Sequence, residues 1–330
     1  MTKVVILNDT RLDFHHGCTR VMSVLERGLR AQGMSVTATS PLRHRWWQDR
    51  NFLRHLAQAD RVVINGEGTL HHGRGAGADL LKIVDHDACR APVFLANAIY
   101  QENPADWSRF LEKFRGIWVR DSQSAAELEA AGVRCDGMLP DLTLCDGAIS
   151  GFEQRRMGTI VGDSVDTSIT AGLRKLSQQM NATFLPSLSH LKRPKGRNPF
   201  SRFLRNSYIA RFERSAKKEF PQLHLAKTPD EYARYLARAE LHVTGRFHGV
   251  CFSLLSKTPF VALQSNSWKV EALLSDLGLS ASRLIAVADL NEGLSPSDWE
   301  YSDVELSNID AALLAARESA AEMFSKISAG

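Results

Sequence analysis

The stretch Val243-Thr244-Gly245-Arg246-Phe247-His248-Gly249 places an arginine and a histidine between two apolar runs. Residues 239–243 have the composition of a short buried strand, and residues 250–255 continue as a helix with an apolar face. Polar side chains at such a turn lie at the carboxyl end of the strand, where parallel α/β sheets bind their ligands. The stretch therefore predicts an α/β fold with a ligand site at this turn.

The residue types in this turn indicate an anion site with acid/base chemistry. Arg246 can make a two-pronged contact with a carboxylate or phosphate, and unpaired N–H groups at a helix start also attract anions. Gly245 and Gly249, on either side of Phe247, would let a ligand approach the backbone. His248 could exchange a proton near neutral pH. The alternative is structural, with Arg246 on the surface and His248 filling a gap in the core.

The order of strand, polar turn and helix recurs along the whole chain, which predicts a doubly wound α/β architecture. An irregular stretch near residues 146–158 interrupts the pattern and is expected to link two domains, residues 1–150 and 151–330. The last helix, expected over residues 309–327, is predicted to pack back across both domains. The expected strands cover residues 3–7, 36–38, 61–65, 92–97, 116–119, 159–161, 182–186, 239–243 and 259–263.

Two turns in the first half of the chain also carry candidate residues. The first strand runs into His15-His16-Gly17, where we expect one histidine, His16 being nearer the helix start, to bind an acceptor or transfer a proton. The strand over residues 61–65 opens onto Gly66-Glu67-Gly68. Gly66 and Gly68 would admit a ligand to the backbone and Glu67 could act as a base, with a plain turn as the alternative.

Three charged residues lie at further element ends. Arg120 follows the strand over residues 116–119 and suggests anion binding, whereas Ser122 caps the next helix. Asp141 places a carboxylate at another loop. Lys269 lies at a helix start, where it would hold a phosphate or serve as a surface lysine.

Composition excludes several classes of protein. The five cysteines are scattered singly and no second Cys/His pair has ligand spacing, so no disulfide framework and no metal site are predicted. No P-loop motif and no apolar run of membrane-spanning length occurs, and the N-terminus lacks the pattern of a signal peptide. A net charge of +4 is too small to indicate nucleic-acid binding. We expect a cytoplasmic protein, with the inner face of the membrane as an alternative location.

Residues 191–218 differ from the rest of the chain because they contain ten Lys or Arg and one acidic residue, Glu213. Aromatic and aliphatic residues interleave with the basic ones at roughly helical spacing. Such a segment could contact anionic lipid or a polyanionic substrate, and the alternative is a solvated helical face.

Motifs from both halves together resemble the polysaccharide pyruvyl transferase family. The matching elements are Asn65-Gly-Glu-Gly-Thr-Leu70, Trp118-Val-Arg-Asp-Ser122, Pro140-Asp141, Thr244-Gly-Arg-Phe-His-Gly249, Thr258-Pro259, Lys269 and Leu277-Gly278-Leu279. The chain has Glu67 between two glycines where the family commonly has three glycines, and Phe247 where it commonly has leucine. Its first loop, with Asn8-Asp9 and His15-His16-Gly17-Cys18, also departs from the usual Asn-x-Gly-Asp.

The resemblance implies two Rossmann-like domains facing a central cleft, the arrangement called GT-B, with the acceptor on the N-terminal side and the donor on the C-terminal side. It further implies pyruvyl transfer from phosphoenolpyruvate to a sugar of a cell-surface glycan or exopolysaccharide. The acceptor would be a glycan or a lipid-linked saccharide, and no cofactor would be needed. Arg120, Arg246 and His248 would line the donor site. His248 would be the acid or the partner of the leaving phosphate, and His16, Glu67 or Asp141 the base.

Two other functions remain open at this point. The same fold could use a nucleotide-activated sugar such as a CMP-ulosonic acid, which also presents a carboxylate and a phosphate. The chain could otherwise be a non-catalytic glycan- or lipid-binding protein that acts through residues 191–218. The sequence does not indicate an oligomeric state.

Overall fold

A computed structural model of the chain describes residues 1–147, 155–192, 199–264, 267–290 and 293–330. The chain divides into two compact units. The first contains Met1–Leu12, Val21–Gly147 and Ala311–Gly330, and the second contains Asp13–Arg20 and Ala148–Asp310. Parts of two expected segments, residues 148–154 of the linker and 193–198 of the basic segment, lie outside the described residues.

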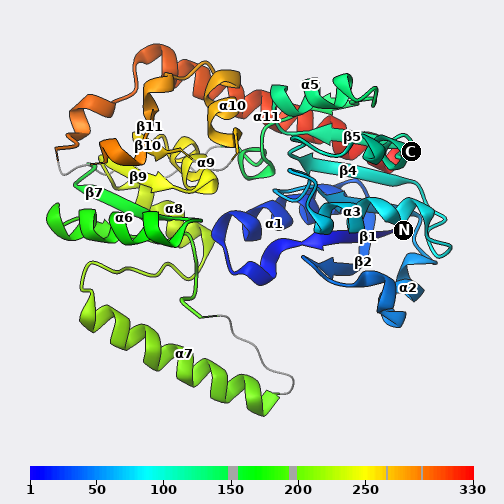
Figure 1. Ribbon diagram of the computed structural model, residues 1–330, viewed down its shortest axis with the longest axis horizontal. Helices are drawn as coiled ribbons and strands as arrows, with labels where there is room; N and C mark the ends of the chain where they lie inside the picture. The colour runs from blue at the N-terminus through cyan, green and yellow to red at the C-terminus, as the bar shows by residue number, and fades with distance from the viewer. Residues whose placement is uncertain (148–154, 193–198, 265–266, 291–292) are drawn as a thin grey trace. The chain divides into compact units, whose positions relative to one another are not determined.

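The first unit is built on a parallel sheet whose strands lie in the order β2-β1-β3-β4-β5-β6 (Figure 1). Its strands are β1 (Thr2–Asp9), β2 (Met34–Pro41), β3 (Arg61–Asn65), β4 (Val93–Ala98), β5 (Gly116–Val119) and β6 (Gly137–Met138). The order reverses between β1 and β3. In open α/β sheets, ligands bind beyond the carboxyl ends of strands at such a point.

Both faces of this sheet are buried, as the apolar strands require. Successive residues of β1 alternate between two cores: Val5 and Leu7 pack on one face, and Val4 and Ile6 on the other. The first face is covered by α2 (Arg50–Leu56), α3 (Gly75–Leu81), α4 (Ser108–Leu111) and α5 (Ser122–Ala130). The second is covered by α1 (His16–Ala31) from Val21 onward and by the part of α11 (Asp303–Ala329) that follows Asp310.

The second unit repeats the same topology with its own parallel sheet, in the order β11-β10-β9-β7-β8 (Figure 1). Its strands are β7 (Thr159–Ser164), β8 (Thr183–Phe184), β9 (Leu241–Gly245), β10 (Phe260–Leu263) and β11 (Leu284–Ile285). Its helices are α6 (Thr167–Gln179), α7 (Pro199–Glu219), α8 (Pro229–Ala237), α9 (Phe247–Leu255) and α10 (Lys269–Asp276). The strand order reverses between β7 and β9, so the predicted site after residue 243 lies at this unit's reversal point.

The predicted fold class, α/β with two Rossmann-like domains, is confirmed. The predicted GT-B cleft depends on how the two domains are placed relative to each other, and it stays a prediction. Among the described helices, none combines the length and apolar composition that a membrane span requires.

The loop after β1 differs from expectation, because Asp13–Arg20 belongs to the second unit. Two backbone bonds explain the assignment: Ser189 N donates to Phe14 O and His16 N donates to Ser187 O, each at 2.9 Å. This short antiparallel pairing joins the loop to the segment that follows β8. The helix α1 consequently begins at His16, three residues before the predicted start at Thr19.

Candidate functional site

The turn between β9 and α9 is organised by an ion pair that the sequence analysis did not anticipate. Arg246, the N-cap residue of α9, donates from Nε and Nη2 to Oδ2 of Asp163, at 2.9 and 2.7 Å. Asp163 lies near the carboxyl end of the neighbouring strand β7, and its Oδ1 accepts from Ser187 N at 2.8 Å. Nε and Nη2 of Arg246, which was predicted to bind an anion, therefore already bind a buried carboxylate. Nη1 is the group of Arg246 that could donate to a ligand.

The two glycines of this turn have a packing role. A Cβ on Gly245 would lie 2.6 Å from the Cβ of Ser164, and a Cβ on Gly249 would collide with the hydroxyl of Thr244. Close packing of β9 on β7 explains Gly245, and close packing of α9 on β9 explains Gly249. Both glycines were predicted to let a ligand approach the backbone. Phe247 is half-buried, with its ring 5.6 Å from the His248 ring.

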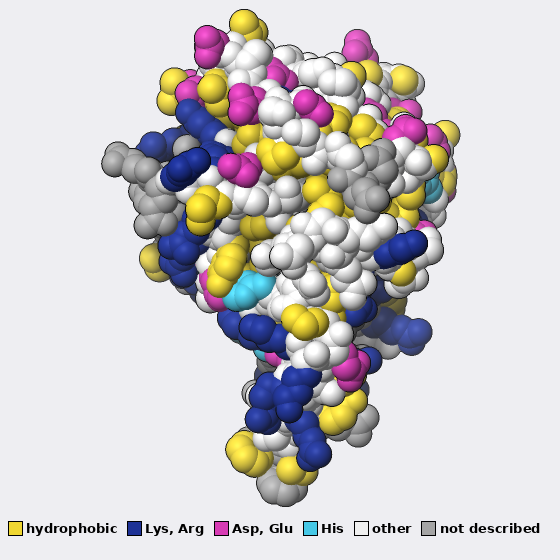
Figure 2. All heavy atoms as spheres, turned by 90° about the vertical axis from the view of Figure 1, so that its left-hand side faces the viewer, with side chains coloured by type: hydrophobic (Ala, Val, Ile, Leu, Met, Phe, Trp, Pro, Cys, Tyr) yellow, Lys and Arg dark blue, Asp and Glu magenta, His cyan; other side chains and the backbone are white. Residues whose placement is uncertain are grey.

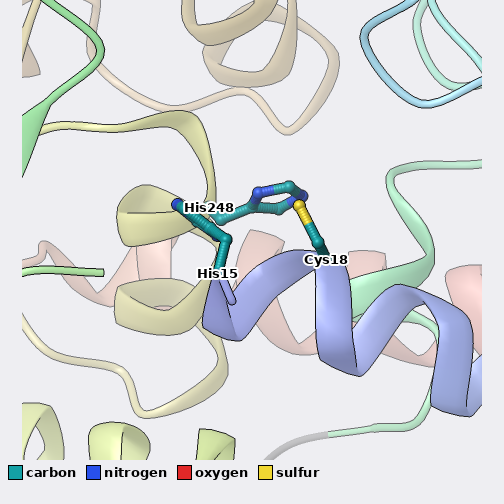
Figure 3. Close-up of side chains that lie close together, drawn as sticks. All are labelled: His15, Cys18 and His248. Atoms are coloured by element: carbon teal, nitrogen blue, oxygen red, sulfur yellow. The ribbon is translucent and has the colours of Figure 1, made fainter. Parts of the chain in front are cut away.

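His248 lies in the first turn of α9 and meets the start of α1 (Figure 3). Its ring centroid is 5.2 Å from that of His15, the residue just before α1, and the Cys18 side chain comes from the first turn of α1. A Cβ on Gly17 would collide with the imidazole of His248. Gly17 is therefore required by the close approach of His248, rather than by the approach of a ligand to the backbone.

The side chains of His15, Cys18 and His248 could hold a metal ion, because one potential ligand atom from each lies within 4.8 Å of the others. Local spacing in the sequence predicts no metal site, because His248 is far along the chain from the other two residues. A histidine and a cysteine three residues apart at a helix start are the sequence signal that could have indicated the pair.

His16, a predicted base, is buried and stacks on the ring of Tyr232 in α8, at 4.9 Å between ring centroids. Desolvation by burial lowers the pKa of His16 to about 4, against the opposing hydrogen bond with the backbone of Ala226. A histidine with this pKa is neutral at pH 7 and only a weak base. This favours a packing role for His16.

A second buried histidine lies inside β9. Burial lowers the pKa of His242 to about 3. Its Nδ1 is 2.7 Å from the Ser253 hydroxyl, which donates to the carbonyl of Gly249. Since the hydroxyl proton is used in that bond, Nδ1 of His242 must be the donor in the first one. His242 is thus a neutral residue that joins β9 to α9.

The reversal point of the first unit carries a network of asparagine side chains. Asn8, at the end of β1, donates to Asn65 O and Thr69 Oγ1 at 2.6 and 2.9 Å. Asn97 of β4 donates to Asn65 Oδ1 at 3.3 Å. Because Asn8 and Asn97 adopt positive φ angles of 65° and 58°, the strand ends turn sharply here. The network fixes the carboxyl edge of β1, β3 and β4.

Glu67 belongs to this network and is buried. Its Oε2 accepts hydrogen bonds from Thr10 Oγ1 at 2.7 Å and Asn65 Nδ2 at 3.2 Å. The flanking glycines differ in role: a Cβ on Gly66 would lie 2.5 Å from the Cβ of Ala98, whereas Gly68 has φ +54° and shapes the turn. A buried carboxylate at the reversal point of a parallel sheet is a candidate for acid/base chemistry.

Arg120 and Asp141 form a buried ion pair, with Nη1 of the arginine 3.1 Å from Oδ2 of the aspartate. Asp141 Oδ1 also accepts from Thr143 N at 2.9 Å. These bonds give Asp141 a structural explanation and make it a weaker candidate for a base than Glu67. Lys269 is the first residue of α10, as expected, and its side chain is half-buried.

A cavity of about 300 Å³ lies in the first unit beside Asn8. Among the described residues, Asn8 Oδ1 has no hydrogen-bond partner, although the residue is buried. The cavity is lined by aromatic, basic and acidic side chains, including Arg43, Trp46, Trp47 and Asp79. It therefore combines ring faces with hydrogen-bonding groups at the edge of the sheet.

Comparison with known protein families assigns the chain to one of them. A profile of the polysaccharide pyruvyl transferase family matches residues 25–267, which is most of the sequence. The chain belongs to this family. It is therefore a transferase. A comparison with curated protein sequences gives no match.

Solved structures resemble this pyruvyl transferase family member in fold. A functionally uncharacterised protein from Klebsiella pneumoniae aligns with a TM-score of 0.52 and 11% identity, over 86% of this chain and 92% of that one. The UDP-GlcNAc 2-epimerase of Methanocaldococcus jannaschii, in complex with UDP-GlcNAc and UDP, aligns with a TM-score of 0.52 and 11% identity, over 94% and 99%. At this identity the likeness concerns the fold alone.

Removal of the Asp163 carboxylate should strongly destabilise this family member. Asp163→Ala leaves Arg246 and Ser187 N without their acceptor, so we expect the free energy of unfolding of the second unit to fall by about 3–5 kcal/mol in urea denaturation. Asp310→Ala is the control, because Asp310 pairs with Lys257 while 59% exposed. That change should cost under about 1 kcal/mol. Equal losses in the two variants would contradict the role of Asp163.

Stability should also depend on pH through His16 and His242. The unfolded chain binds protons on both below about pH 6.5, whereas folding lowers their pKa values to about 4 and 3. The free energy of unfolding should therefore fall as the pH drops from 7 to 5, by up to about 1.4 kcal/mol per pH unit for each histidine. His242→Asn keeps a donor for Ser253 and should flatten this dependence, measured by urea denaturation at each pH. If the free energy of unfolding depended on pH in the same way in the variant and in the unaltered protein, the proposed contribution of His242 would be wrong.

Proposed function

We propose that the protein transfers a pyruvyl group from phosphoenolpyruvate to two hydroxyls of a glycan sugar, forming a ketal. The observation that carries the proposal is the β9–α9 turn. Within a chain of this family, the turn joins an arginine and a histidine at the carboxyl end of a parallel strand, next to a helix start. Such a position suits a donor with a carboxylate and a phosphate.

In the proposed reaction, Arg246 contacts the donor through Nη1 while Asp163 holds its Nε and Nη2. The fixed guanidinium would lose little conformational freedom on binding, which favours orientation of the donor. His248 lies in the first turn of α9, two residues after Arg246, and acts as the acid or hydrogen-bonds the leaving phosphate. Arg120 and Lys269 stay further candidates for anion contacts.

The chemistry balances as follows. A proton is added to the methylene carbon of phosphoenolpyruvate, which becomes a methyl group and leaves positive charge at C2. One sugar hydroxyl forms a C–O bond to C2 and loses its proton. The C2–O bond to phosphate then breaks, and the second hydroxyl forms the other C–O bond and loses its proton. The products are the ketal and inorganic phosphate, so one of the two hydroxyl protons replaces the one added to carbon and the other leaves with the phosphate.

For the acceptor, we propose the cavity beside Asn8 in the first unit. Trp47 offers a ring face to a sugar, and Asn8 Oδ1 offers an acceptor to a sugar hydroxyl. Glu67 is connected to Asn8 through Asn65 and is the proposed base. The acceptor would be a saccharide of a cell-surface glycan or exopolysaccharide, free or linked to a lipid.

Substitution in the β9–α9 turn tests the reaction. With phosphoenolpyruvate and an acceptor glycan, His248→Asn should lower phosphate release by about 10²- to 10⁴-fold, since it removes the proposed acid. Arg246→Lys should lower it by about 10- to 100-fold, because lysine lacks the second donor edge. His55→Asn in α2 and Arg234→Lys in α8 are matched controls and should leave the rate unchanged. Full activity of His248→Asn would exclude the proposed role.

A nucleotide-activated sugar, such as a CMP-ulosonic acid, is the competing donor. Thermal denaturation separates the two, because a ligand at 100 times its dissociation constant stabilises the folded state by about 2.7 kcal/mol. We expect phosphoenolpyruvate to raise the melting temperature, and CMP and UDP to leave it unchanged. The reverse pattern would favour a glycosyltransferase.

We further propose that α7 holds the enzyme at an anionic membrane, where lipid-linked acceptors would be present. The helix has two different faces. Ile209 is buried, Ala216 packs against the core of the second unit, and Glu213 bonds His190 and Lys227 at 3.1 and 2.8 Å. Leu204, Tyr208 and other apolar side chains on the far side are exposed.

Basic side chains share the exposed face of α7. Arg211, Arg214, Lys217 and Lys218 are exposed, and Arg205 lies over the ring of Tyr208 at 5.2 Å. Figure 2 shows dark blue and yellow side chains side by side at the bottom of the view, the level at which α7 lies in Figure 1. Interleaved cations and exposed apolar groups such as Phe203, which is 67% exposed, are typical of helices that lie on anionic lipid.

Vesicle sedimentation tests the membrane contact. The protein should bind vesicles that contain phosphatidylglycerol and not those of phosphatidylcholine alone, and salt should weaken the binding. The pair Lys217→Glu and Lys218→Glu should reduce binding at least about tenfold, at about 1 kcal/mol for each lost cation. Lys175→Glu in α6 is the control and should have little effect. Equal binding to both kinds of vesicle would contradict the proposal.

A further inference from the structure

His15, Cys18 and His248 form a cluster in the second unit, and the proposed function gives a role to His248 alone. We propose that the three side chains bind a zinc ion, and that one coordination position stays open for a substrate oxygen. Figure 3 shows that two side chains come from the start of α1 and the third from the start of α9. The inference concerns metal binding itself and does not depend on the proposed reaction.

The three side chains would have to move only slightly toward one another to bind one zinc ion. One potential ligand atom from each residue lies within 4.8 Å of the others. With zinc–nitrogen and zinc–sulfur bonds of about 2.0–2.3 Å, tetrahedral ligands are roughly 3.4–3.6 Å apart. His15 and Cys18 are three residues apart, so they lie on one face of the first helical turn. Rotation of side chains can close a gap of about 1 Å between them and His248.

The backbone around the cluster also brings these residues together. Gly17 lies between the two ligands of the α1 start, and any side chain there would collide with the imidazole of His248. The backbone bonds of Phe14 and His16 to the 187–189 segment fix the start of α1 within the same unit as α9. The site would therefore be preformed by the fold, which lowers the entropic cost of binding an ion.

The donor set identifies the metal class. A thiolate with two imidazoles matches zinc and related transition metals, whereas Mg²⁺ and Ca²⁺ prefer oxygen ligands. The two histidines are buried and Cys18 is half-buried. Three protein ligands with an open side are typical of catalytic zinc, and structural zinc has four protein ligands.

Zinc binding would break one hydrogen bond and remove one proton. Gly17 N donates to Nδ1 of His15 at 3.1 Å, and zinc at that nitrogen would take the lone pair and free the N–H at the helix start for a ligand or water. The thiol of Cys18 would lose its proton, so affinity should rise with pH. Zinc-bound His248 could not also donate a proton. In the metal-bound protein the ion would contact the anionic oxygens of the proposed donor in place of an imidazolium.

The test uses the full chain, purified under reducing conditions and stripped of metal by a chelator. After incubation with Zn²⁺ and dialysis, we expect about one zinc per chain by elemental analysis. Co²⁺ in place of zinc should give visible ligand-field bands of a tetrahedral site and a thiolate-to-cobalt charge-transfer band in the near ultraviolet. Cys18→Ser should abolish the charge-transfer band and weaken zinc binding on the order of 100-fold or more, and His15→Asn should weaken it similarly.

Cys89→Ser is the matched control, because Cys89 is also half-buried but belongs to the first unit. It should leave zinc content and the cobalt spectrum unchanged. Gly17→Ala, which displaces His248 and keeps all three ligands, should reduce zinc affinity while Cys18 remains present. Circular dichroism of every variant checks that it is folded.

Two results would overturn the inference: a folded protein that retains no zinc, or a cobalt spectrum that is the same with and without Cys18. Either would leave the cluster as a packed thiol–imidazole contact. Because metal content and the cobalt spectrum are measured without substrate, failure of the zinc site and failure of pyruvyl transfer are separate outcomes.

Discussion

The second unit depends on the carboxylate of Asp163. One oxygen holds the guanidinium of Arg246 and so fixes the start of α9 against β7. The other holds the backbone N–H of Ser187. The carbonyl of Ser187 accepts from His16 N, and this bond sets the start of α1. One buried side chain thus connects two strand ends and two helix starts, which explains how His248 comes to lie against Gly17.

Buried polar side chains also meet at the reversal point of the first unit, where amides surround the carboxylate of Glu67 in place of an ion pair. Asn8, Asn65 and Asn97 bond to one another across the carboxyl ends of β1, β3 and β4. Amide side chains donate and accept at once, so a chain of them can satisfy a buried strand edge without the desolvation cost of charge. Glu67 is held within this network. Both units therefore use the reversal point of the same strand order to collect polar groups, one around a charged pair and one around amides.

The surroundings of the histidines in the second unit separate them into two kinds. His16 and His242 are neutral packing residues whose pKa values burial lowers to about 4 and 3. His248 is also buried, but it lies beside His15 and the half-buried Cys18. Residue type alone could not distinguish these roles, because each histidine follows or precedes an apolar run. The surrounding atoms decide whether an imidazole serves packing or chemistry.

Sequence by itself determined much of this protein. Short apolar strands that end in polar turns predicted the parallel α/β sheets, because buried strands on both faces need continuous apolar runs. The stretch from Thr244 to Gly249 was correctly predicted to join a strand to a helix, although the helix starts at Phe247, three residues before the predicted start, and so includes His248. Only the tertiary structure decided which partners these residues have. Asp163 is 83 residues before Arg246, and Cys18 lies near the start of the chain, far from His248 in sequence. Local spacing carries no information on such contacts. Parallel sheets depend on such contacts, since each neighbouring strand is reached through a helix.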